Sequence, residues 1–210
     1  MPAEPFSWNA VVIGAWNTAI LSPDGVRRRL FDLPDGTPIE LEVAIDRPAQ
    51  FRVGHDGLVV IPTSSVLEVT TRQPDAASLE RACGLCSRAL AGLPETPVSA
   101  VGVNVRYRFA ELPDSLLDLM RAPVDDALAD ADFEVRGAGT RRTVPLGPGL
   151  VNIEVKQVGA EGSLEFNFHL NSAVVAELTQ WLGRVNELVE LSDRLAAVMG
   201  VANVRGEVHA

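Results

Sequence analysis

The segment that most constrains the fold is a long amphipathic stretch near the end of the chain, residues 173–199. Mostly apolar residues recur there at alternating spacings of three and four, which is the period of one face of an α-helix. The row consists of Leu178, Trp181, Val185, Leu188, Ser192, Leu195 and Met199. Further apolar residues widen this face on both sides, so it is broader than the seam of a two-stranded coiled coil. A face of that width is typical of a helix that packs on a sheet.

The wide apolar face of this helix also predicts that the chain associates with copies of itself. We expect it to cover the chain's own sheet and to leave an apolar edge for a second copy, with Trp181, Leu188 and Leu195 as candidate interface residues. A homodimer, or another homo-oligomer, is the expected assembly. Leu188→Glu or Leu195→Glu should then dissolve it.

Alternation of apolar and polar residues predicts antiparallel strands in both halves of the chain. The clearest examples are Val101–Phe109 and Leu164–Leu170, and a third covers residues 39–45. His55-Asp56-Gly57 is typical of a hairpin turn between two short strands. Residues 8–13 are expected to form a strand that is buried on both faces. Runs of strands followed by helices favour the α+β class over a parallel α/β sheet.

The order of these elements divides the chain into three parts. Residues 1–112 form an N-terminal α+β half, residues 113–131 a helical connector, and residues 132–210 three strands with the long helix. Both halves have strands followed by an amphipathic helix, which is a similarity of element order and not of residues. Separate units and one continuous domain are both compatible with this order.

Composition narrows the possible environments and partners. With 47% apolar residues the chain can bury a core, and its net charge of −10 opposes binding to nucleic acid phosphates. Arg27, Arg28 and Arg29 are the obvious local basic patch, which we interpret as a solvated helix end. No apolar run approaches the roughly 20 residues of a membrane span, and no secretory signal is recognisable, so the cytoplasm is the expected location.

For two short motifs we favour a structural role over a functional one. Cys83 and Cys86 have CxxC spacing, but they fall in the middle of a predicted helix on its apolar stripe, so both thiols are expected in the core. No second cysteine pair accompanies them, and neither a metal nor a cofactor is expected. Gly137 and Gly139, followed by Arg141 and Arg142, could cradle a phosphate. They lack the rest of the dinucleotide or P-loop pattern, so a strand bulge or a turn is the preferred interpretation.

The remaining candidates for chemistry lie on polar strand faces. Arg106 and Arg108 alternate with apolar residues on one predicted strand, and Asn167 and His169 do so on another. If these strands are neighbours, the four side chains form a ligand-binding face. No catalytic motif accompanies them or the other histidines, His55 and His209, so catalytic residues are unknown and we do not expect an enzyme.

These patterns favour a non-catalytic protein-interaction or assembly protein that forms homo-oligomers. The alternative is a small-molecule or anion-binding protein, or an enzyme, that uses the polar sheet face. A regulatory partner of nucleic acid machinery is a third class, which depends on Arg27–Arg29 alone. A deep pocket at the polar face would favour the second class, whereas a flat face would favour the first.

Overall fold

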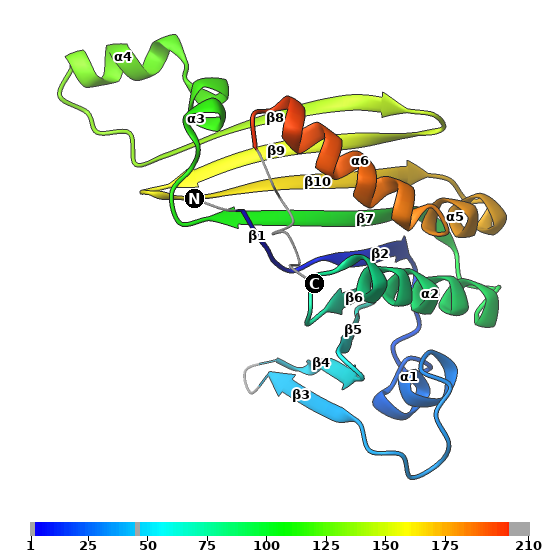
Figure 1. Cartoon of the computed structure of the whole chain (residues 1–210). Coiled ribbons are helices and arrows are strands. Elements are labelled where there is room, and N and C mark those ends of the chain that lie inside the picture. The colour runs from blue at the N-terminus through cyan, green and yellow to red at the C-terminus, as the bar shows by residue number, and fades with distance from the viewer. Residues whose placement is uncertain (1–2, 45–46, 202–210) are drawn as a thin grey trace, which may run out of the picture.

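The chain folds around one antiparallel sheet, which confirms the α+β class (Figure 1). The structure is a computed structural model that describes residues 3–44 and 47–201. Within them the strands are β1 (Glu4–Pro5), β2 (Asn9–Gly14), β3 (Glu40–Ala44), β4 (Arg47–His55), β5 (Leu58–Pro62), β6 (Val66–Thr71), β7 (Val98–Phe109), β8 (Gly137–Leu146), β9 (Gly149–Val158) and β10 (Glu161–Asn171). The helices are α1 (Pro23–Arg29), α2 (Ala76–Gly92), α3 (Asp114–Met120), α4 (Pro123–Asp130), α5 (Val175–Leu182) and α6 (Val185–Val198).

Both halves of the chain contribute to this single sheet. Its order is β3-β4-β5-β6-β2-β7-β10-β9-β8, with β1 pairing to β7 beside this path. Apart from β1, the strands form two consecutive sets, β2–β6 and β7–β10. In each set the first strand pairs with the last one, β2 with β6 and β7 with β10, and the other strands follow outward. Strands β2 and β7 pair antiparallel at the centre and join the two sets. The two sets therefore share a strand topology, and the boundary between them lies before β7.

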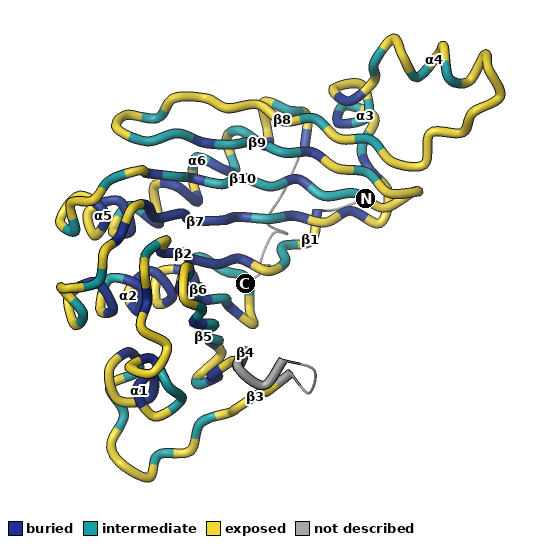
Figure 2. The backbone as a smooth tube through the Cα atoms, turned by 180° about the vertical axis from the view of Figure 1, so that it is seen from behind, coloured by how far each residue is buried: buried dark blue, intermediate teal, exposed yellow. Residues whose placement is uncertain are grey.

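The core lies between this sheet and the helices α2, α5 and α6, which cover one of its faces (Figure 1). Alternate residues of β7 and β10 point into it, including Tyr107, Phe166 and Phe168, all of which are fully buried. Trp8 packs edge-on against Tyr107, which in turn packs against Phe166. Figure 2 shows the sheet from the opposite side, where no helix lies over the central strands.

Strand β2 departs from the sequence prediction. Residues 8–13 were expected to be buried on both faces. Trp8, Ala10 and Val12, which face the helices, are fully buried, and Asn9 on the other face is buried as well. Val11 is half-buried and Ile13 is exposed. Both lie on the sheet face that the helices leave open, so the expectation of a doubly covered strand was wrong.

The helix predicted over residues 173–199, which we call the closing helix, packs on the sheet as predicted, but it is two helices and not a single continuous one. It is divided into α5 and α6 at Gly183 and Arg184. Glycine is a poor helix former, and at this point the Gly183 N–H bonds to Thr179 while Arg184 N–H bonds only three residues back, to Trp181. Both α5 and α6 contact α2 and β7, and Figure 1 shows the change of direction between them. Gly200, with φ +78°, follows the end of α6 as the sequence predicts.

An arm leaves the body between β7 and β8. Helix α3 is anchored by Leu116 and Met120, which are buried. Helix α4 follows it and projects away from the sheet (Figure 1). None of the residues of α4 is buried.

Candidate binding face

The open face of the sheet carries a row of polar residues that crosses six strands. Each pair of neighbours in the row stands directly opposite in the strand register: Asn9 faces Asn104, Asn104 faces Asn167, Asn167 faces Asn152, and Asn152 faces Thr143. On the other side of Asn9 the row continues with Thr70 of β6. Opposite residues in antiparallel strands project from the same face, so these side chains are neighbours.

Hydrogen bonds connect the whole row. The amide of Asn104 donates to Asn9 Oδ1 at 2.6 Å, and the amide of Asn167 donates to Asn104 Oδ1 at 2.6 Å. Asn152 donates to Asn167 Oδ1 at 3.0 Å, and the Thr143 hydroxyl donates to Asn152 Oδ1 at 2.8 Å. At the other end the Asn9 amide and the Thr70 hydroxyl both donate to the Glu68 carboxylate. We call these residues the amide row.

The amide row is a rigid feature with spare hydrogen-bonding capacity. An asparagine amide has two N–H donors and an oxygen with two lone pairs, and each asparagine in the row uses one of each toward its neighbours. Asn9 and Asn104 are buried, while Asn152 and Asn167 are half-buried and present their remaining capacity to solvent. Gly102 leaves room for the row, because a Cβ there would lie 3.3 Å from Asn167 Nδ2.

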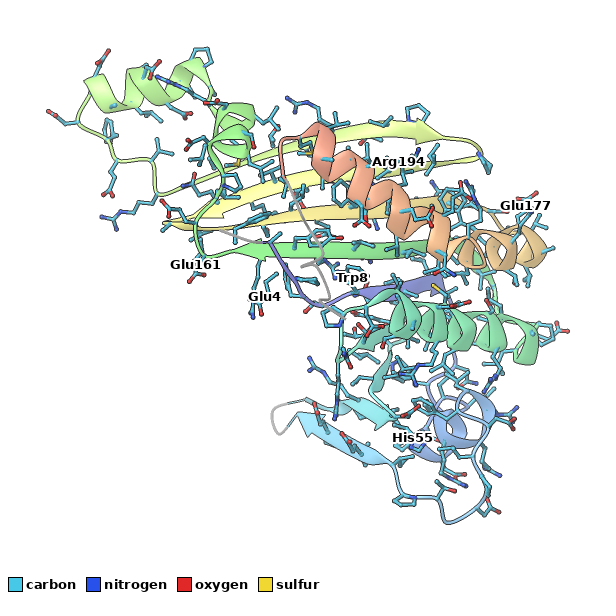
Figure 3. All side chains as sticks on the ribbon, viewed as in Figure 1. Glu4, Trp8, His55, Glu161, Glu177 and Arg194 are labelled. Atoms are coloured by element: carbon cyan, nitrogen blue, oxygen red, sulfur yellow. The ribbon has the colours of Figure 1, made fainter. Side chains whose placement is uncertain are left out.

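The two arginines of β7 beside the amide row form ion pairs. Arg106 donates to Glu165 at 3.0 Å and to the carbonyl oxygen of Ser7 at 2.8 Å. Arg108 binds Glu4 with both its Nε and one terminal nitrogen, and this hydrogen bonding lowers the pKa of Glu4. Glu4 and Glu161 lie at the same end of the sheet (Figure 3). These arginines are therefore already engaged by carboxylates.

The structure places all four predicted ligand-binding residues on the open face of two neighbouring strands, β7 and β10. Their roles differ from the prediction of a common site. Asn167 belongs to the amide row, Arg106 and Arg108 are in ion pairs, and His169 Nε2 lies 2.8 Å from Asn171 Oδ1. None of five surface hollows in the described part of the chain is lined by any of the four.

Sequence reasoning missed the rest of the amide row. Asn9, Asn104, Asn152, Glu68 and Thr143 were not among the candidates. An asparagine at a polar strand position is common, and only the register shows that four of them are aligned. The one signal in the sequence is that three predicted strands have an asparagine on the polar side of their alternation.

The predicted interface residues of the closing helix lie mostly inside the chain. Trp181 and Leu188 are fully buried in the chain's own core, so they have no surface left for a partner. Leu195 is only partly buried and keeps an accessible edge. A role for Leu195 in an interface stays a prediction. Leu188→Glu would disrupt the core itself and so does not test for a dimer.

Two further motifs are clarified by the structure. The segment Gly137–Arg142 is neither a turn nor a bulge, because it pairs in regular register with Val158–Ile153; that expectation was wrong. Arg27 of the basic patch is buried and pairs with Asp24 at 2.6 Å and Asp35 at 2.7 Å. This pairing neutralises part of the patch that a nucleic acid would need. His209 lies outside the described residues.

Cys83 and Cys86 are buried in α2, as the apolar stripe predicts. Burial raises the pKa of the Cys83 thiol to about 12 and that of Cys86 well above its usual value. Because only the thiolate attacks a thiol reagent, both cysteines of the folded protein should react at least about a hundredfold more slowly at pH 8 than in guanidinium chloride. The release of thionitrobenzoate from Ellman's reagent measures this. Rapid titration of a thiol in native buffer would contradict it.

Among the described residues no group of three or more histidine, cysteine, aspartate or glutamate side chains could hold a metal ion. No described helix is long and apolar enough to cross a membrane. The fold and the face together define an α+β protein with one helix-covered and one open sheet face. Comparison with protein family models, with curated proteins and with solved structures gives no match.

Proposed function

We propose that the chain is a non-catalytic protein-interaction or assembly protein that forms homo-oligomers and binds a protein partner on its open sheet face. The observation that supports this most directly is the amide row. It holds polar side chains of six strands in one fixed arrangement, so little side-chain entropy is lost when a partner docks. Amide donors and acceptors match the backbone and amide groups of another polypeptide.

The chemistry of the face favours a protein over other ligands. Arg106 and Arg108, its two central arginines, are paired with carboxylates, which weakens their attraction for phosphates or small anions. The aromatic side chains of the central strands, Trp8, Tyr107 and Phe166, lie on the covered side, so they offer no stacking platform for bases or sugars. None of five surface hollows in the described part of the chain is lined by Arg106, Arg108, Asn167 or His169, and a polar face without an enclosed pocket is typical of surfaces that bind proteins.

The proposal is tested by quantitative affinity purification of the tagged chain from its native cells. Glu154→Lys with Thr143→Arg alters the accessible end of the open face. Glu190→Lys with Asn186→Arg, on the exposed side of α6, makes the same change of charge elsewhere and is the matched control.

We expect a protein that copurifies in stoichiometric amount with the unaltered chain and with the control, and that the face variant loses at least about tenfold. A partner that all three chains retain would contradict the proposal. So would native mass spectra that show a bound small molecule and no protein.

A further inference from the structure

The helix α4 lacks support from its own chain. It has eight residues, none of them buried by the described part of the molecule. Isolated helices shorter than about 12–15 residues are marginal in water, so such a helix is normally stabilised by packing. Apolar side chains nevertheless lie on this arm: Val124 is 57% exposed, Phe133 is 64% exposed, and Leu119 is exposed as well. The arm therefore offers apolar surface that the chain leaves uncovered.

The arm also carries most of the net negative charge of the chain. Residues 111–134 contain eight carboxylates (Glu111, Asp114, Asp118, Asp125, Asp126, Asp130, Asp132 and Glu134) and one basic residue, Arg121. Eight negative charges and one positive charge give this segment a net charge of −7, compared with −10 for the whole chain. Two of the eight carboxylates are in ion pairs, Asp126 with Arg121 and Glu134 with Arg136, each at 3.1 Å. Two arms placed side by side would repel each other, so a basic surface is the better electrostatic match for this arm.

A basic surface of suitable form follows directly in the sequence. Residues 135–148 contain three arginines and no carboxylate. Two of them, Arg141 and Arg142, lie on β8, an edge strand of the sheet, and neither has an ion-pair partner within the described residues. Val144 lies on the same side of β8 as Arg142 and is exposed, whereas Arg141 projects from the open face, where it stands opposite Glu154. We call Arg141, Arg142 and Val144 the basic edge.

The basic edge is poorly suited to pair with its own copy. Antiparallel pairing of two β8 strands around Arg141 and Arg142 would place like charges opposite one another. Pro145 also lacks the N–H that strand pairing needs. Both features protect an edge strand from its own copies, while they leave it open to an acidic helix.

We propose that the arm of one chain docks on the basic edge of a second copy, and that the two chains exchange arms reciprocally in a homodimer. Asp126 and Asp130, one turn apart on α4, would lie along the β8 edge, within reach of Arg142 from one face of the sheet and of Arg141 from the other, and Phe133 would cover Val144. A twofold dimer contains this contact twice, which helps it to reach the roughly 1,200 Å² of a stable interface. This inference rests on the homo-oligomeric part of the proposed function and names the surfaces involved.

Charge reversal on each side tests the inference by sedimentation velocity of the full chain at micromolar concentration. One variant carries Arg141→Glu and Arg142→Glu, and the other carries Asp126→Arg and Asp130→Arg. Each should raise the dissociation constant at least about tenfold. Arg29→Glu with Arg194→Glu, at exposed arginines elsewhere, makes the same charge change as the first variant and should leave the dimer intact. Circular dichroism shows that each variant is folded.

Mixing the two reversed variants gives the decisive result. In a mixed dimer both contacts again join opposite charges, so the two chains should form a heterodimer although neither forms a homodimer. An unaltered chain that stays monomeric at low salt would overturn arm exchange together with the homo-oligomeric part of the proposed function. A dimer that survives both reversals, or a mixture that stays monomeric, would overturn arm exchange alone. The binding of a partner to the open face is measured separately.

Discussion

Replacement of Asn104 by alanine should lower the free energy of unfolding by about 2–4 kcal/mol. Asn104 is buried at the centre of the amide row, and its loss removes the donor to Asn9 Oδ1 and the acceptor for the Asn167 amide. A buried polar group that loses its partner is destabilised by its full desolvation penalty, which applies here to the buried Asn9 oxygen, while the half-buried Asn167 amide loses its acceptor as well. Guanidinium chloride unfolding, followed by circular dichroism, measures the change.

Asn152→Ala is the matched control for this prediction. Asn152 makes the same kind of hydrogen bonds at the half-buried end of the row, to Asn167 and Thr143, where water can replace them. The loss should stay within about 1 kcal/mol. Equal losses for the two variants would mean that burial at the centre of the row contributes nothing to its stability.

Gly149→Ala should destabilise the fold by at least about 2 kcal/mol. A Cβ at Gly149 would lie 2.5 Å from the carbonyl oxygen of His169 and 2.6 Å from the ring of Trp181. The carbonyl belongs to the neighbouring strand, and Trp181 is fully buried beneath α5, so neither can move without disturbing the core. Thermal and chemical unfolding both report the effect.

Gly84→Ala is the corresponding control for that glycine replacement. Gly84 lies on the exposed side of α2, and a Cβ there meets nothing within 4 Å. Alanine in a helix loses less backbone entropy on folding than glycine, so this variant should be more stable by about 0.5–1 kcal/mol. If Gly149→Ala proves as harmless as Gly84→Ala, the packing of α5 on the sheet is looser than the structure indicates.

The fold class could be predicted from the sequence because burial on one side leaves a periodic trace. The alternation in Val101–Phe109 and the helical spacing after residue 173 both report which side chains face the core. The break at Gly183 was missed, since the apolar spacing continues through it and only the packing of α5 and α6 requires two helix directions. A single glycine is too common inside helices to predict such a break.

The candidate face was predictable only in part. The polar sides of β7 and β10 were recognised, because each is internal to one strand. The amide row depends on which strands are neighbours and in what register, for example Asn9 opposite Asn104, which lies 95 positions later in the chain. Strand pairing and register depend on how whole strands pack together. The residues next to either asparagine therefore carry no signal of which strand becomes its neighbour.

The position of β7 has a consequence for the order in which the protein can be made. During synthesis β7 emerges after its partner β2, but its other neighbour, β10, begins at Glu161, more than fifty residues later. Until then β7 is the outer strand of a half-built sheet, and its unpaired backbone offers a template to any other nascent chain. The acidic segment 111–134 follows it at once, so like charges oppose the close approach of two such half-built chains.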